Sequence, residues 1–299
     1  DLRRQGSLWS QTAGLLLLDR IAAAAQRTPD ETLWLGDSLR AAYGSASAVE
    51  TRIHNLVDLT NTAYINGGVT GRLRLVHAME VAYRDDNDNE TALEQMSGYE
   101  AGVGPKTADP AFNALRAARE TYGADLVTLL RDFRDPENDG CGIAWLLGGS
   151  LQGLAAGEGW DTLGYSVVSD GSDVNEEDSK SYFCRETTLA HEVGHNMGAA
   201  HDQDTAKGDD GTLDNPDDYG AYTYSFGYKV GTSGGNFYTV MAYGDSGQKG
   251  YTTFSTPNTT FCGGMPWGTA GADKVKTLNN TMPVVSGLRD SLVDEEDEK

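Results

Sequence analysis

The stretch from His191 to His201 constrains this chain more than any other, because it holds three of the five histidines in the pattern H-E-V-G-H-N-M-G-A-A-H. On a helix, His191 and His195 lie four residues apart and share nearly the same face, so both imidazoles can bind one metal ion. If the helix continued, His201 would be rotated by about 240° and would point away. Gly198 can end the helix in a left-handed turn. The pattern therefore predicts a metal site with its third ligand on a loop.

The ligand set indicates what such a site does. Structural zinc sites are normally closed by four protein ligands and are rich in cysteine, whereas three histidines leave one coordination position open. A structural zinc site is the alternative that this rule disfavours. The open position predicts a zinc-bound water, and Glu192, next to His191, is the expected general base for that water. The stretch predicts a zinc hydrolase.

The pattern H-E-x-x-H-x-x-G-x-x-H resembles that of the metzincin zinc metalloproteases, which also carry a methionine turn further along the chain. Met241, within T-V-M-A-Y at 239–243, is the candidate for that turn. Asp202, directly after the third histidine, resembles the reprolysin-like branch. Shorter matches at 73–77 and 141–144 resemble the bacterial group that includes the peptidyl-Asp metallopeptidases.

The resemblance implies an α/β fold: a twisted mixed sheet, mostly parallel, with helices above a zinc cleft and a smaller irregular lower half from about residue 201. The expected strands are 32–35, 72–83, 125–131, 141–147 and 164–169. The expected helices are 46–65, 110–122, the zinc helix from an N-cap at Thr187 to about Met197, and 275–292, which is kinked or begins near Pro283. The acidic run 85–90 is predicted to be a solvated turn.

The resemblance also implies roles for residues around the metal. Met241 would form an apolar floor under the imidazoles, and Asp202 would orient the following turn by hydrogen bonds. Tyr243 would either contact the zinc or form a pocket wall. An edge strand that binds the substrate in antiparallel orientation is expected at Ile143, Ala144, Trp145 and Leu146, because an unpaired edge offers backbone hydrogen bonds to any extended peptide. A fully paired interior strand is the alternative.

Composition excludes several other functions. The chain has 23 Lys and Arg against 45 Asp and Glu in 299 residues, a net charge of −22, which argues against binding to nucleic acid or an anionic membrane. The longest apolar run, 13–18, is too short to cross a bilayer. No signal peptide is recognised, so we expect a chain that is already processed or trimmed. The carboxylates of 202–218 lack EF-hand spacing, and calcium is a second candidate ion without an assignable site.

Three cysteines allow one disulfide. A Cys141–Cys184 bond would anchor the approach to the zinc helix and, by the chain-entropy model, would stabilise the fold by about 4 kcal/mol. The sequence leaves two alternatives: Cys262 pairs with Cys184, or all three are free thiols. The two remaining histidines, His54 and His77, are expected to be ordinary helix and strand residues because no other ligands accompany them.

We therefore predict a secreted, monomeric zinc metalloendopeptidase that cleaves polypeptides and binds neither nucleic acid nor membranes. The expected organisation is an N-terminal extension at 1–30 with a helix at 15–25, a catalytic domain at 31–292 and an acidic tail at 293–299. Two other functions are open: a catalytically silent metzincin-like binding domain, and a zinc amidase that acts on a small molecule.

Overall fold

The computed structural model describes residues 30–83, 86–260 and 264–292. The predicted helix at 15–25, Cys262 and the predicted acidic tail lie outside these residues. The helices and strands in chain order are β1 (Asp30–Gly36), α1 (Asp37–Tyr43), α2 (Ala46–Gly67), β2 (Arg74–Val81), α3 (Asn89–Ser97), β3 (Tyr99–Glu100), β4 (Gly104–Pro105), α4 (Asn113–Tyr122), β5 (Leu126–Asp132), β6 (Gly142–Ala144), β7 (Tyr165–Asp170), β8 (Ser172–Val174), β9 (Ser181–Phe183), α5 (Thr188–Asn196), α6 (Gln203–Ala206), β10 (Lys229–Val230), β11 (Phe237–Tyr238), β12 (Lys249–Gly250) and α7 (Lys274–Val285).

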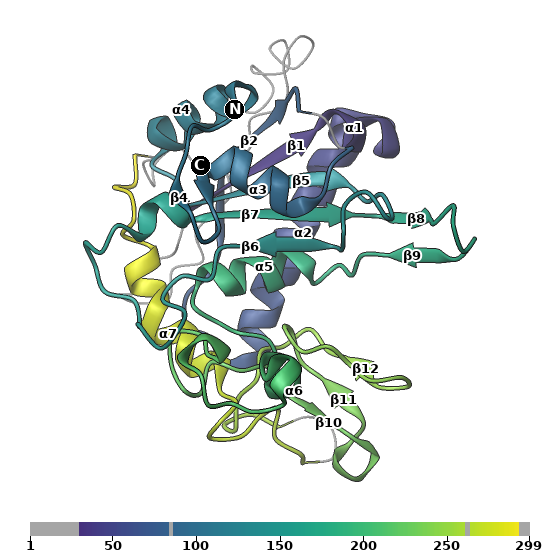
Figure 1. Cartoon of the computed structure of the whole chain (residues 1–299), viewed down its shortest axis with the longest axis vertical. Coiled ribbons are helices and arrows are strands. Elements are labelled where there is room, and N and C mark those ends of the chain that lie inside the picture. Colours follow the sequence, from purple (N-terminus) through teal and green to yellow (C-terminus); the bar gives the residue numbers. More distant parts are fainter. Residues whose placement is uncertain (1–29, 84–85, 261–263, 293–299) are drawn as a thin grey trace, which may run out of the picture.

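The main sheet has five strands in the order β2-β1-β5-β7-β6 (Figure 1). The first four run parallel to one another, whereas β6 is antiparallel to β7, with Gly142 opposite Val168 and Ala144 opposite Ser166. This arrangement confirms the expected α/β fold with a mixed sheet. Among the described strands, β6 pairs in this sheet only with β7, so it lies at the edge of the described sheet, as predicted.

Both faces of the sheet are covered, as parallel sheets require. Side chains of β5 alternate between the faces: Leu126 and Leu130 enter the core beneath α2 and α5, while Val127 and Leu129 enter the core beneath α3 and α4. Helix α2 shows why the sequence folds this way, since Val49, Ile53, Leu56 and Val57 recur at helical spacing and are all buried. Helix α5, which carries His191 and His195, packs against both α2 and the sheet strands β6 and β7.

After residue 201 the chain forms only short regular elements until α7 (Figure 1). A three-stranded sheet in the order β10-β11-β12 is built from two-residue strands. Helix α7 packs back onto the large core through Val275, Leu278 and Met282, together with residues of α2 and α5. The chain beyond 201 is thus fixed to the upper half by its last helix. Among the described residues, no helix has the length and apolarity needed to cross a membrane.

The prediction of a solvated turn at 85–90 is wrong for residues 88–90. Asp88 caps α3 by accepting a hydrogen bond from the Thr91 amide at 2.6 Å, and Asn89, the first residue of that helix, is buried. An acidic loop reads as solvated, but an aspartate followed by helix-forming residues is also an N-cap signal. Helix α1 was likewise not predicted.

Several predicted elements are longer than those observed, and in two of them a tertiary contact accompanies the early end. The strand expected at 141–147 pairs as a strand only over Gly142–Ala144, because the Leu147 amide turns away and donates to the His195 carbonyl at 3.2 Å. The closing helix ends at Val285, and Pro283 lies inside it. After Val285, the Arg289 amide donates a hydrogen bond to the Asp125 carboxylate at 2.9 Å. This tertiary contact fixes the segment 286–292, which was predicted to be helical.

Candidate metal centre and catalytic site

Helix α5 and the turn after it deliver the three histidines as predicted. Gly198 has a φ of 80°, and the Ala199 amide donates to the Gly194 carbonyl, which ends the helix. A Cβ on Gly198 would lie 2.7 Å from the Cβ of Ala221, so no side chain fits at this turn. The chain then reverses and brings His201 beneath the helix. Thr187 precedes α5, but its side chain makes no capping hydrogen bond, so the predicted cap is wrong in that detail.

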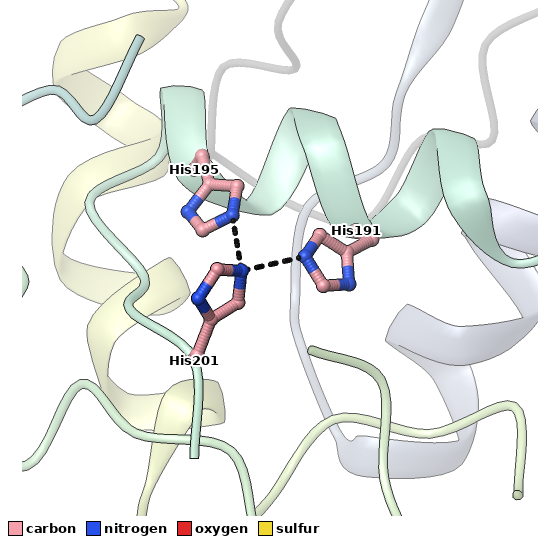
Figure 2. Close-up of side chains that lie close together, drawn as sticks. All are labelled: His191, His195 and His201. Atoms are coloured by element: carbon pink, nitrogen blue, oxygen red, sulfur yellow. Dashed lines mark hydrogen bonds between the residues drawn. The ribbon is translucent and has the colours of Figure 1, made fainter. Parts of the chain in front are cut away.

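The three imidazoles point at one another (Figure 2). The Nε2 atom of His201 lies 3.1 Å from that of His195 and 3.1 Å from that of His191. Two nitrogens bound to one tetrahedral zinc ion at about 2.05 Å would be separated by about 3.3 Å, so the cluster fits this metal. Nδ1 of His195 donates to the Ala199 carbonyl at 2.8 Å, which leaves Nε2 as the metal-binding nitrogen.

The electrostatics of the cluster favour neutral imidazoles. Burial lowers the pKa of His191 and His195 well below the ordinary value, and burial followed by the nearby Lys274 lowers the pKa of His201 to about 4. All three therefore hold unprotonated nitrogens at neutral pH, which is the form that binds a metal. Among the described side chains, no other group of three His, Cys, Asp or Glu gathers closely enough to hold an ion. A calcium site in 202–218 therefore receives no support.

Glu192 lies beside the cluster and is 4% exposed. It lines both cavities that meet at the histidines, and burial raises the pKa of its carboxyl well above the ordinary range. The carboxylate lies directly against Gly142 of β6: a Cβ built there would be 2.7 Å from Oε1 of Glu192 and 2.8 Å from the Val167 carbonyl. Gly142 thus leaves the space that Glu192 occupies, a role that no sequence pattern indicated.

If Glu192 is the general base, replacing Gly142 by Ala should lower kcat/KM by at least about tenfold, because a displacement of a catalytic group by about 1 Å can cost a hundredfold. The measurement is peptide hydrolysis by the folded variant. Gly231→Ala is the matched control, since a Cβ at that position meets nothing within 4 Å. Unchanged activity of the Gly142 variant would show that the position of Glu192 is not limited by this contact.

Asp202 and Met241 join the zinc helix to the following turn. Asp202 is buried and accepts hydrogen bonds from the Tyr243 amide at 3.0 Å and from the Thr205 hydroxyl at 2.8 Å. Met241 is buried and has a φ of 69°, and its Sδ occupies the space that a Cβ on Gly194 of α5 would need. Met241 therefore packs closely under the helix that carries two of the histidines, and Asp202 orients the turn.

Tyr243 stands at the opening of the cluster. Its hydroxyl is 3.4 Å from Nε2 of His201, and its ring centroid is 4.8 Å from that of His201 and 5.8 Å from that of His191. The side chain is 53% exposed and lines both cavities. Tyr243 is thus part of the pocket wall and also lies within reach of groups at the metal position.

The edge strand and the two cavities form the surroundings of the cluster. One cavity of about 300 Å³ is lined by Ile143, Ala144 and Leu146, and a second of about 820 Å³ is lined by Cys141 and Gly142. Both contain His191 and Glu192. Trp145 is the exception among the predicted edge residues, because it lines neither cavity and its ring packs edge-on against Tyr99. The sequence could not separate it from its neighbours.

Cys141 and Cys184 form a disulfide with a Cα–Cα distance of 5.3 Å, which decides between the alternative pairings. The bond joins the start of β6 to the segment that enters α5. Asn196 reinforces this connection by donating from Nδ2 to the carbonyls of Trp145 at 2.9 Å and Tyr165 at 3.1 Å. Asn196 was not singled out from the sequence, although its position beside His195 was a signal. His54 and His77 lie in α2 and β2, away from the cluster, as expected.

Comparisons with known proteins agree with this geometry. The family described as "Metallo-peptidase family M12B Reprolysin-like" matches residues 36–272. Proteins called peptidyl-Asp metalloendopeptidase are similar: that of Pseudomonas aeruginosa is 30% identical, covering 91% of this chain and 43% of its own length. That of Xanthomonas campestris is 26% identical, and the match covers 83% of this chain and 48% of the relative. The chain spans about half the length of these relatives.

A solved chain titled "Structure of a chaperone-substrate complex" shares the fold, with a TM-score of 0.61 and 17% identity over 92% of this chain and 38% of that chain. The family match includes the three histidines, Glu192 and Met241. The chain belongs to the reprolysin-like M12B family of metallopeptidases.

Proposed function

We propose that the chain is a zinc-dependent endopeptidase that cleaves polypeptides outside the cell. One observation carries the proposal: Nε2 of His201 lies 3.1 Å from Nε2 of His191 and 3.1 Å from Nε2 of His195, and two cavities share His191, the buried Glu192 and Gly142 of the edge strand β6 as lining residues. An extended peptide can add to a free strand edge through its backbone, whatever its side chains. A cleft of this shape suits a chain more than a small molecule.

Zinc held by His191, His195 and His201 would polarise the peptide carbonyl and make a water molecule more acidic. Glu192 accepts the proton of that water and delivers it to the departing amine. Its burial favours the stage at which the side chain holds the proton, because desolvation disfavours the charged carboxylate. The backbone of β6 holds the substrate in line.

Tyr243 is proposed to donate a hydrogen bond to the carbonyl oxygen as negative charge develops on it, since its hydroxyl lies 3.4 Å from Nε2 of His201 at the mouth of the cluster. Replacing Tyr243 by Phe should lower kcat by about ten- to a hundredfold and change KM less, because such donors act mainly in the transition state. Tyr182→Phe, on the exposed strand β9, is the control. An unchanged kcat of the Tyr243→Phe variant would contradict this role and show that Tyr243 only lines the pocket.

Two further properties belong to the proposal. The Cys141–Cys184 disulfide supports an oxidising location, because such bonds are rare in the cytosol. The relatives' name, peptidyl-Asp metalloendopeptidase, supports aspartate as a recognised residue of the substrate.

A peptide library with cleavage sites read by mass spectrometry tests the proposal, with metal content measured on the same sample. We expect cleavage that a chelator stops and that added zinc restores. Absence of cleavage with zinc bound would instead favour a silent binding domain.

A further inference from the structure

Arg185 is the cation of the larger cavity beside the histidines. Among the described residues that line this cavity, it is the only lysine or arginine. It comes directly after the disulfide-bonded Cys184, and its carbonyl accepts hydrogen bonds from the Thr188 amide at 2.9 Å and the Thr188 hydroxyl at 2.7 Å. The backbone that carries Arg185 is therefore held from both sides.

The guanidinium group has a defined place in the cavity wall. Its Cζ lies 4.9 Å from the ring centroid of Tyr238, over the ring. Gly250, which pairs with Tyr238 across β11 and β12, leaves room for it: a Cβ there would lie 2.6 Å from Nη1 of Arg185. Stacking on an aromatic ring fixes the plane of a guanidinium and leaves its N–H groups directed outward.

The neighbouring carboxylates do not neutralise Arg185. Among the described residues, no ion pair to Arg185 is formed. Glu186 accepts a hydrogen bond from Arg52 at 3.0 Å instead, and Asp139 lines the same cavity but forms no ion pair with Arg185. The guanidinium is exposed and available to a ligand carboxylate. In a chain with a net charge of −22, this cation therefore lines the same cavity as His191.

The smaller cavity lacks such a cation. Asp217 and Asp218 line it, and no lysine or arginine does so among the described residues. An acidic substrate side chain is therefore attracted to the Arg185 side of the histidines and repelled on the other side. The two cavities together would distinguish the two sides of the cleaved bond.

The direction of the edge strand indicates which cavity receives the part of the substrate that follows the cleaved bond. Antiparallel pairing is slightly more stable than parallel pairing, so an added peptide should run opposite to β6. Cys141, directly before β6, lines only the Arg185 cavity, and Gly142 lines both cavities, whereas Ala144 and Leu146 line only the smaller one. The carboxyl-terminal side of the peptide thus enters the Arg185 cavity.

We propose that Arg185, held on the ring of Tyr238, selects an acidic side chain at the residue that follows the cleaved bond. The inference rests on the proposed peptidase function and adds a specificity-determining residue to it. A planar guanidinium can bind both oxygens of one carboxylate, which favours Asp over the isosteric Asn.

The test uses the zinc-loaded protein and two quenched fluorescent peptides that differ only in Asp or Asn after the cleaved bond. Wild type should prefer Asp by at least about tenfold in kcat/KM. Arg185→Gln should bring the Asp/Asn ratio close to one, mainly through KM, and Arg185→Glu should shift the preference to a Lys peptide. Added salt should weaken the wild-type preference, because Arg185 is exposed.

Lys249→Gln is the matched control, since Lys249 also lies on an aromatic ring, with Nζ 4.9 Å from the Tyr251 centroid, but does not line the cavity. Its Asp/Asn ratio should equal that of wild type. Melting temperatures of all variants establish that they are folded.

A second readout does not depend on hydrolysis: the affinity of the same two peptides for zinc-loaded Glu192→Gln protein, with and without Arg185→Gln. A preference for the Asp peptide that disappears with Arg185 supports the inference even if the wild type cleaves nothing, and in that case the peptidase proposal alone fails. Cleavage and binding that do not distinguish Asp from Asn, or a preference that survives Arg185→Gln, overturn the role of Arg185 while the peptidase proposal stands.

Discussion

Replacing Glu192 by Gln should lower kcat/KM for peptide hydrolysis by a factor on the order of 10³ while zinc stays bound. General acid–base catalysis by a positioned side chain contributes about 10²- to 10⁴-fold, and an amide cannot accept the proton of water at neutral pH. Gln has nearly the same shape as Glu, so it fits the space beside Gly142. The measurement is single-peptide kinetics with zinc determined per chain. A variant with full activity would exclude Glu192 as the general base.

A stability measurement on metal-free protein serves as the control. Burial raises the pKa of Glu192 in the folded state above that in the unfolded chain. The contribution of Glu192 to the stability of the folded state is therefore fully present below the unfolded pKa, and it is lost as pH rises through the higher folded pKa. At pH 7 to 8, metal-free Glu192→Gln should melt at a higher temperature than metal-free wild type. Loss of activity together with gain of stability would separate a catalytic role from a structural one.

Replacing His195 by Ala should weaken zinc binding by at least about a hundredfold and abolish hydrolysis at ordinary zinc concentrations. Changes to the groups that merely orient a ligand already cost about ten- to a hundredfold in metal affinity, and His195 is held in its orientation by the Ala199 carbonyl. A zinc titration followed by both metal content and hydrolysis checks this result. Reversible inhibition by a chelator should reproduce it in the wild type.

His54→Ala is the matched control, because His54 lies on α2 outside the cluster. It should bind zinc and cleave peptides as the wild type does. If His195→Ala kept one zinc ion per chain with unchanged affinity, the three-histidine site would not be the metal site of this protein.

The metal cluster could be predicted from the sequence because its geometry is local. The spacing of His191 and His195 is fixed by the turn of one helix, and Gly198 is three residues beyond. The turn requires a left-handed residue, which glycine adopts without strain, and the structure shows it with a φ of 80°. Asp202 and Met241 were found through their positions relative to these residues.

The strands were less predictable at their ends. The pattern at 141–147 could not show that Leu147 would bond to His195, or that Trp145 would turn toward Tyr99. The pairing of Cys141 with Cys184 was one of several possibilities until the two Cα atoms were found 5.3 Å apart. Such choices depend on segments that are far apart in the chain.

The sequence by itself indicated the three histidines and Glu192 as one candidate site, because their grouping follows from helix periodicity, glycine conformation and ligand chemistry within a short stretch. The resemblance carried by that stretch implied the α/β class. Only the tertiary structure decided that Gly142 makes room for Glu192 and that Arg185 lies over Tyr238. Each of these contacts joins residues about fifty positions apart. Their approach is set by how the sheet, α5 and the chain after residue 201 pack together, and no local pattern contains that information.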